Sequence, residues 1–182
     1  MSAMDQARES EAKPISFDLG PRRAWAWLTL GVSLLAAAES VALAAICSAL
    51  LPEPAAGIVD LVIVVPTVAV VLAIGSALGG RITVDADQFR LRFGLLGGVR
   101  VPRADIVGVE RFVPAVIRPI GLGIDVPIGS RQATVSRGGQ VRYVRVLLGR
   151  PALVRTTLWR RAPADELVVG TGAPDQLVAA LA

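Results

Sequence analysis

The hydrophobic residues of this chain are concentrated in one part of the sequence rather than spread along it. From Ala24 to Leu51 there is no Lys, Arg or Asp and a single Glu, and a second apolar run follows from Ile58 to Leu78. About twenty apolar residues are enough for a helix to cross the hydrocarbon core of a bilayer. The pattern therefore predicts two transmembrane helices, at 24–51 and 58–78.

The charges around these runs predict their orientation. The link between them, residues 52–57, is so short that the helices must form an antiparallel hairpin with both chain ends on one side. The link carries only Glu53, whereas basic residues flank the runs elsewhere: Arg8, Lys13, Arg22, Arg23, Arg81, Arg90 and Arg92. The positive-inside rule places residues 1–23 and 81–182 in the cytoplasm of a multi-pass protein of the cell inner (plasma) membrane.

The N-terminal region is not expected to be a targeting signal. A cleavable signal peptide does not fit the first run, because its apolar core is too long and a second span follows at once. The polar composition of the N-terminal tail, Met1 to Gly20, favours disorder.

After Gly79-Gly80 the continuous apolar pattern changes to alternating apolar and polar residues, which is typical of half-buried strands. We expect strands at 82–85, 89–93, 99–101, 106–113, 132–135, 141–148, 153–158 and 167–170, and a short helix that opens at 173–177. The first four strands should form an antiparallel meander. The apolar stretch from Pro114 to Ser130 is either a loop against the lipid surface or an additional strand. The expected fold class is α+β.

The soluble part is similar to a known family. The stretch from Ile82 to Val109, with a Gly-Leu-Leu-Gly turn at 94–97 and a Pro-x-x-x-Ile step at 102–106, resembles bacterial pleckstrin-homology-like (PH-like) domains. Together with the hairpin, residues from about 80 to 182 resemble two-helix actinobacterial membrane proteins of undefined function. The resemblance implies a strongly bent antiparallel sheet that the final helix closes at one corner. It implies no phosphoinositide site, because the first turn, at 85–88, is acidic.

The composition excludes several classes of function but does not identify one. There is no histidine, and the one cysteine, Cys47, lies in the first apolar run. The acids of the soluble part are scattered over turns and strand ends, and no glycine group matches a phosphate-binding loop. We therefore expect no enzyme activity, no catalytic residues, no cofactor and no metal site. Lys13 is the only lysine, so the net charge of +4 reflects an arginine bias typical of a GC-rich genome, and nucleic acid is not an expected partner.

Glu39 is the candidate polar residue inside the membrane. A charged carboxylate at mid-span costs several kcal/mol unless it is paired or protonated, so we expect Glu39 to be neutral or hidden between helices. It is either a site for proton coupling or partner contact, or a hydrogen-bond donor to a neighbouring helix. Beside it runs a helix-packing face of small residues, Ala36, Ser40, Ala44 and Ser48. That face packs against the second span or mediates self-association.

Two groups of basic and aromatic residues have expected surface roles. The first group consists of membrane-interface anchors, namely Arg22, Arg23, Trp25, Trp27 and Arg81. The second is a possible basic patch of Arg150, Arg155, Trp159, Arg160 and Arg161, which either faces lipid or an acidic partner, or guards a solvated strand edge.

These patterns favour a membrane-anchored, PH-like interaction module over an enzyme. The expected partners are the lipid bilayer and another membrane protein or a second copy of the chain. The alternative function is a small accessory subunit of a transporter or an envelope-biogenesis complex that contacts its partner through Glu39. An enzyme acting on lipids would need carboxylates that the fold brings together without any sequence signal.

Overall fold

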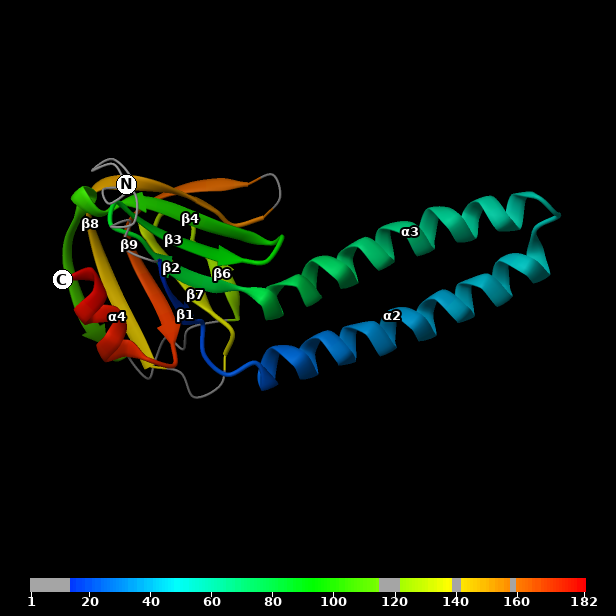
Figure 1. Cartoon of the computed structure of the whole chain (residues 1–182). Helices are drawn as coiled ribbons and strands as arrows, with labels where there is room; N and C mark the ends of the chain where they lie inside the picture. The colour runs from blue at the N-terminus through cyan, green and yellow to red at the C-terminus, as the bar shows by residue number, and fades with distance from the viewer. Residues whose placement is uncertain (1–13, 115–121, 139–141, 158–159) are drawn as a thin grey trace, which may run out of the picture.

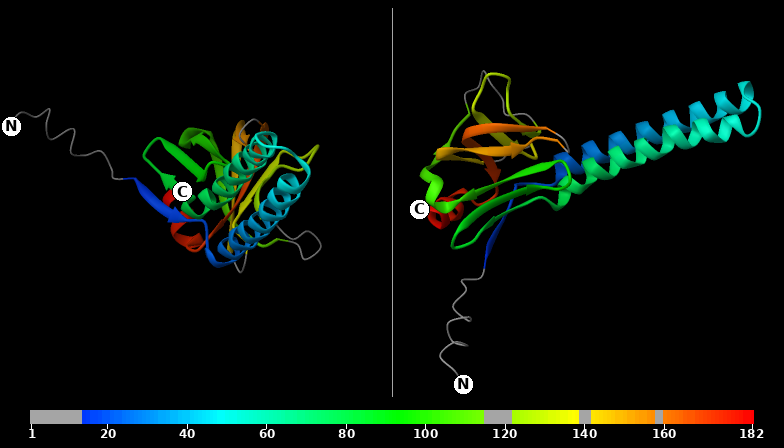
Figure 2. Two further views of the ribbon diagram at one scale, coloured as in Figure 1. Left: turned by 90° about the vertical axis from the view of Figure 1, so that its right-hand side faces the viewer. Right: turned by 90° about the horizontal axis from the view of Figure 1, so that it is seen from above.

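The structure is a computed structural model that describes residues 14–114, 122–138, 142–157 and 160–182. It consists of a β-sheet domain and a pair of long helices that leave the domain from one end (Figure 1). The two further views show these helices side by side along their whole length (Figure 2).

The predicted helical hairpin is present. It consists of α2 (Arg23–Leu50) and α3 (Ala55–Ser76), followed by the short 3-10 helix η1 (Ala77–Gly79). Both helices are long and apolar enough to cross a membrane, and no residue of the most apolar window of either helix is buried. Pro66 lies inside α3 without ending it. Their length and composition therefore allow both helices to cross a membrane.

The domain contains a nine-stranded mixed sheet and a C-terminal helix. The strands are β1 (Ile15–Asp18), β2 (Arg81–Val84), β3 (Gln88–Phe93), β4 (Gly97–Pro102), β5 (Ile106–Phe112), β6 (Gly123–Asp125), β7 (Gln132–Ser136), β8 (Arg142–Arg155) and β9 (Arg161–Thr171). They follow the order β1-β2-β3-β4-β8-β9-β7-β6, with β5 paired to β8. The 3-10 helix η2 (Arg103–Asp105) precedes β5, and helix α4 (Pro174–Leu181) packs on β5 and β8. The final helix is thus confirmed.

Three details of the sheet differ from the sequence prediction. The meander holds for β2, β3 and β4, but β5 pairs with β8, and β7 and β9 are parallel. The strands expected at 141–148 and 153–158 are one strand, β8, whose register shifts between Leu147 and Ala152. An irregularity of this kind bends a strand without ending it. In the stretch 114–130, residues 123–125 form β6, and residues 115–121 lie outside the described residues.

The end of the N-terminal tail is ordered, contrary to expectation. Residues 15–18 form β1, an edge strand that pairs with β2 so that Asp18 lies opposite Arg81. Phe17 and Leu19 are buried in the core, which stabilises this short segment. The chain therefore contributes to the sheet before it enters the hairpin and again after it leaves.

The alternation along the first strands after the hairpin separates two faces of the sheet. Phe89, Leu91 and Phe93 of β3 are buried, as are the alternate residues of β2 and β4. The side chains between them, such as Arg90 and Arg92, are exposed on the opposite face. One face of these strands therefore packs in the core, and the other face is exposed and accessible to a ligand.

Candidate functional site

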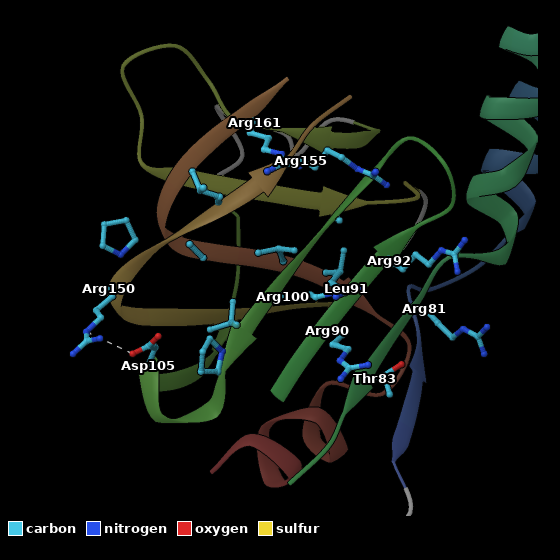
Figure 3. A pocket seen from close by; sticks show the side chains of 18 residues that line it. Arg81, Thr83, Arg90, Leu91, Arg92, Arg100, Asp105, Arg150, Arg155 and Arg161 are labelled. Carbon is cyan, nitrogen blue, oxygen red and sulfur yellow. Dashed lines mark ion pairs between the residues drawn. The ribbon is translucent and has the colours of Figure 1, made fainter. Parts of the chain in front are cut away.

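The exposed face of the sheet forms an open groove with a volume of about 950 Å³. Strands β2, β3, β4, β8 and β9 build it. Its lining includes seven arginines: Arg81, Arg90, Arg92, Arg100, Arg150, Arg155 and Arg161 (Figure 3). We call it the arginine groove. Asp105 is the one acidic residue that lines it.

Sheet register places four of these arginines in one row across five strands. Arg81 lies opposite Arg92, Arg92 opposite Gly98, Gly98 opposite Arg155, and Arg155 opposite Arg161. Directly opposite residues point to the same face, with Cβ atoms about 5 Å apart. The row therefore brings together guanidinium groups from β2, β3, β8 and β9.

Glycine occupies the crossing point of this row for a steric reason. Strand β4 touches β8 through a single register pair, Gly98 and Arg155. A Cβ atom at Gly98 would collide with the Leu91 carbonyl oxygen, and one at Gly97 would collide with that of Arg155. The middle of the row therefore has no side chain, and the floor of the groove is open there.

Most of the positive charge in the groove is not neutralised. Arg150 lies 3.8 Å from Asp105, and Arg90 lies 3.6 Å from Asp85. Within the part of the chain that the structure describes, Arg81, Arg92, Arg100, Arg155 and Arg161 form no ion pair. Like charges on directly opposite strand positions destabilise a sheet. The arrangement thus has a stability cost that a bound anion would remove.

The side chains of the groove are suited to binding an anion. A guanidinium group stays charged at any physiological pH and offers a planar set of N–H donors that matches the oxygens of a phosphate or carboxylate. Two such groups side by side can hold one anion through several charge-assisted hydrogen bonds. The other polar side chains of the lining are Thr83 and Asp105.

Contacts at the base of the hairpin fix the groove relative to the helices. The turn between β3 and β4 contacts the end of α3, where the Leu95 backbone N–H donates to the Ser76 hydroxyl oxygen at 2.7 Å. Gly94 in this turn has a φ of +58°, and a Cβ atom there would collide with Ser76. The turn can therefore approach α3 this closely only with glycine at this position.

Trp25 lies in the core, not at the surface as expected for an interface anchor. It is 4% exposed, its indole N–H donates to the Ile74 carbonyl oxygen at 2.8 Å, and its ring meets Phe93 edge-on at 5.1 Å. It thus joins α2 to α3 and to the sheet. Trp27, two residues further along and therefore on the opposite side of α2, is 72% exposed.

The contacts between the helix ends and the sheet form what we call the junction. Arg137 belongs to it, and sequence analysis missed this residue. It is fully buried, and its guanidinium donates to the carbonyl oxygens of Ala77 and Leu78, both at 3.1 Å, and of Gly20 and Gly80. It also forms an ion pair with Asp18. Carbonyls at the end of a helix lack partners and attract cations. Arg137 therefore caps the end of the hairpin and joins it to the segment before α2.

The residues of α2 that the sequence singles out, Glu39 and the small-residue face, lie on two sides of the helix. Ala36, Ser40 and Ala44 are half-buried along the hairpin, whereas Glu39 and Ser48 are exposed. Glu39 is therefore not hidden between α2 and α3. Within the described residues it forms no ion pair.

The predicted basic patch is part of a larger surface. Arg150, Arg155 and Arg161 line the groove, whereas Arg160 does not, and Trp159 lies outside the described residues. Arg81, which we expected only as an anchor, lines the groove as well, while Arg22 pairs with Asp18 and Arg23 begins α2. Sequence analysis missed the contribution of Arg90, Arg92 and Arg100. Their alternation with buried residues places them on one face, but only the register shows that β8 and β9 continue that face.

Comparison with known proteins does not assign a family. No family model, curated protein or solved structure matches this chain. The geometry of the groove and of the junction is therefore the basis for a function.

Proposed function

We propose that this chain is a non-enzymatic integral membrane protein that presents a binding module at the cytoplasmic face of the membrane. The arginine groove is its binding surface, for a protein partner or for the lipid surface. The observation that carries the proposal is the row Arg81, Arg92, Arg155 and Arg161, which forms no ion pair within the described residues and starts at β2, directly after the hairpin.

The hairpin supports membrane insertion. With a rise of 1.5 Å per residue, the 22 residues of α3 extend about 33 Å, close to the hydrocarbon thickness of about 30 Å. Leucine, isoleucine and valine side chains are exposed along both helices. Such a continuous apolar surface is unfavourable in water and favourable in lipid.

The junction supports a fixed position of the groove relative to the bilayer. Trp25, Ser76 and Arg137 each link a helix end to the sheet or to the segment before α2. A rigid anchor keeps the groove at one height above the membrane and raises its effective concentration toward ligands at the surface. Weak contacts between the groove and such a ligand are then sufficient for binding.

The resemblance to bacterial PH-like domains belongs to this proposal. In its favour, the strands β2–β4 form an antiparallel meander and α4 packs at one end of the sheet. The parallel pairing of β7 with β9 is a departure from an all-antiparallel sheet. Actinobacterial two-helix membrane proteins remain the group that the sequence resembles.

Site-directed labelling tests the topology. In a Cys47→Ala background, Glu53→Cys in the link should react with a membrane-impermeant maleimide on intact cells. Ala104→Cys in η2, which is exposed in the structure, should react only after permeabilisation. Labelling of Ala104→Cys from outside would place the groove on the other side of the membrane and reject the proposal.

Purification from native membranes tests the binding role. The tagged full chain and a variant with Arg81, Arg92, Arg155 and Arg161 all changed to Gln are isolated in a mild detergent, and bound proteins and lipids are identified by mass spectrometry. We expect a ligand that the variant loses. If both forms carry the same ligands, the groove is not the binding surface.

Glu39 supports a second candidate function, an accessory subunit that contacts its partner within the membrane. The observation in its favour is the position of Glu39 on the exposed side of α2, where a cationic residue of a neighbouring protein could reach it. Glu39→Gln should then abolish co-purification of the partner, while Glu53→Gln in the link should not. Equal recovery with both variants would reject this candidate.

A further inference from the structure

The row of arginines in the groove is divided into two pairs. Arg81 and Arg92 are direct register partners on β2 and β3, and Arg155 and Arg161 are direct partners on β8 and β9. Gly98 on β4 separates the pairs. Because adjacent strands lie about 4.8 Å apart, Arg92 and Arg155 are separated by roughly 10 Å at the backbone. Each pair is the size of a site for one tetrahedral anion, and the spacing allows two anions to bind side by side.

The pairs lie close to the expected surface of the bilayer. If the 22 residues of α3 cross the hydrocarbon core, its end at Ser76 lies near the edge of that core, and Arg81 follows five residues later. The headgroup region extends roughly 5–8 Å beyond the hydrocarbon on each side. Figure 3 shows the side chains of Arg81 and Arg92 on the side of the groove nearest the hairpin, and the turn after β3 and the end of β8 point the same way as the helices (Figure 1).

We propose that the two arginine pairs bind two phosphate groups of anionic lipid headgroups from the bilayer that the hairpin spans, one phosphate per pair. This inference rests on the proposed membrane topology and names the ligand of the groove. The lipid is either one molecule with two phosphates, as in cardiolipin, or two molecules with one phosphate each, as in phosphatidylglycerol.

Charge and geometry favour such a lipid over a zwitterionic one. A guanidinium pair matches the oxygens of a phosphodiester through parallel N–H donors. Phosphatidylcholine carries the same phosphate, but its choline cation would be repelled by the remaining arginines of the groove. An anionic leaflet also concentrates its lipids around basic residues at its surface. Bound phosphates would offset the repulsion between Arg81 and Arg92 and between Arg155 and Arg161.

Native mass spectrometry of the full chain, released from nanodiscs of phosphatidylcholine with a minor fraction of phosphatidylglycerol or cardiolipin, tests the inference. The variants are Arg81→Gln with Arg92→Gln, and Arg155→Gln with Arg161→Gln. The matched control, Arg103→Gln with Arg142→Gln, removes the same charge outside the groove. The melting temperature of each variant verifies that it is folded.

The wild type and the control should retain two phosphatidylglycerol molecules or one cardiolipin. Each groove variant should retain one phosphatidylglycerol and bind cardiolipin roughly tenfold to a hundredfold more weakly. Equal retention by all four proteins, or equal loss in the control, would overturn the inference.

Two further experiments distinguish a lipid phosphate from a soluble phosphate, and a lipid ligand from a protein partner. Soluble glycerol phosphate or inorganic diphosphate, added to nanodiscs of phosphatidylcholine alone, should bind far more weakly than the lipids, and equal binding would overturn the lipid assignment. A groove-dependent acidic protein recovered from native membranes without anionic lipid would also overturn it, while leaving the proposed binding module intact. Labelling of the groove side from outside the cell would instead reject the proposed function itself.

Discussion

The guanidinium Nη1 of Arg137 lies 2.6 Å from the Oδ1 of Asp18, although the two residues are separated by the whole hairpin and most of the sheet in sequence. Arg137 follows directly after β7, and Asp18 ends β1. The same guanidinium also binds the carbonyls that follow α3. One buried side chain therefore holds the entry to the hairpin, the exit from it and the sheet together.

Arg137→Ala should be strongly destabilising. The change leaves the carbonyl oxygens of Ala77 and Leu78 without their donor, and each buried polar group that loses its partner costs about 1–3 kcal/mol. Thermal unfolding in detergent measures the effect. Asp18→Asn is the comparison, with a smaller expected loss, because the asparagine oxygen can still accept from the Arg137 guanidinium and the side chain at this position is 49% exposed. Equal melting temperatures for Arg137→Ala and the wild type would contradict the buried network.

Trp25 should contribute to stability, and Trp27 should not. Trp25→Phe removes the indole hydrogen bond to Ile74 and should cost about 1 kcal/mol. Trp25→Ala also removes the edge contact with Phe93 and should cost about 3–5 kcal/mol. Changes at exposed Trp27 should stay within about 0.5 kcal/mol. The same unfolding assay ranks the variants, and similar losses at both positions would show that Trp25 is not a core residue.

Gly94→Ala should weaken the contact between the sheet and α3. Gly94 has a left-handed backbone conformation, which costs an alanine about 1–2 kcal/mol, and the new Cβ would collide with Ser76. Gly172→Ala is a matched control, because nothing lies within 4 Å of a Cβ atom at that position. Equal stability of the two variants would mean that the β3–β4 turn does not pack on α3.

Added salt should raise the stability of the protein, because it screens the repulsion within the arginine row. Screening weakens the repulsion between opposite arginines, which destabilises the sheet by roughly 0.2–1 kcal/mol per pair at low ionic strength. The variant with Arg81, Arg92, Arg155 and Arg161 changed to Gln should melt at a higher temperature than the wild type in low salt and respond less to salt. Melting curves in a zwitterionic detergent at several salt concentrations test this. A lower melting temperature for the variant would show that these arginines make stabilising contacts.

Sequence patterns predicted the structural features that depend on residues close together in the chain. The long apolar runs at 24–51 and 58–78 predicted the hairpin, and the strict alternation at 82–84 and 89–93 predicted β2 and β3. The segment 15–18 was missed because four residues give too little alternation and its partner strand lies beyond the hairpin. The Gly-Arg-Pro sequence at 149–151 resembles a turn, so the continuity of β8 was missed as well.

The groove and the junction could not be predicted, because they depend on pairing between distant segments. Arg92 and Arg155 belong to one row only through Gly98, and their sequence positions do not indicate this. Arg137 is similarly indistinguishable in sequence from an exposed arginine after a strand. Its burial results from the way β7 approaches the ends of the hairpin, which no local pattern encodes.

The pairing of β1 with β2 shows where the helical hairpin is inserted in the sheet domain. Asp18 and Arg81 are directly opposite in an antiparallel pair, so the two helices occupy the place that a reverse turn has in an ordinary β-hairpin. Exchange of the two helices for a reverse turn would therefore leave the order of the strands unchanged. The helices are thus an insertion into one connection of the sheet domain.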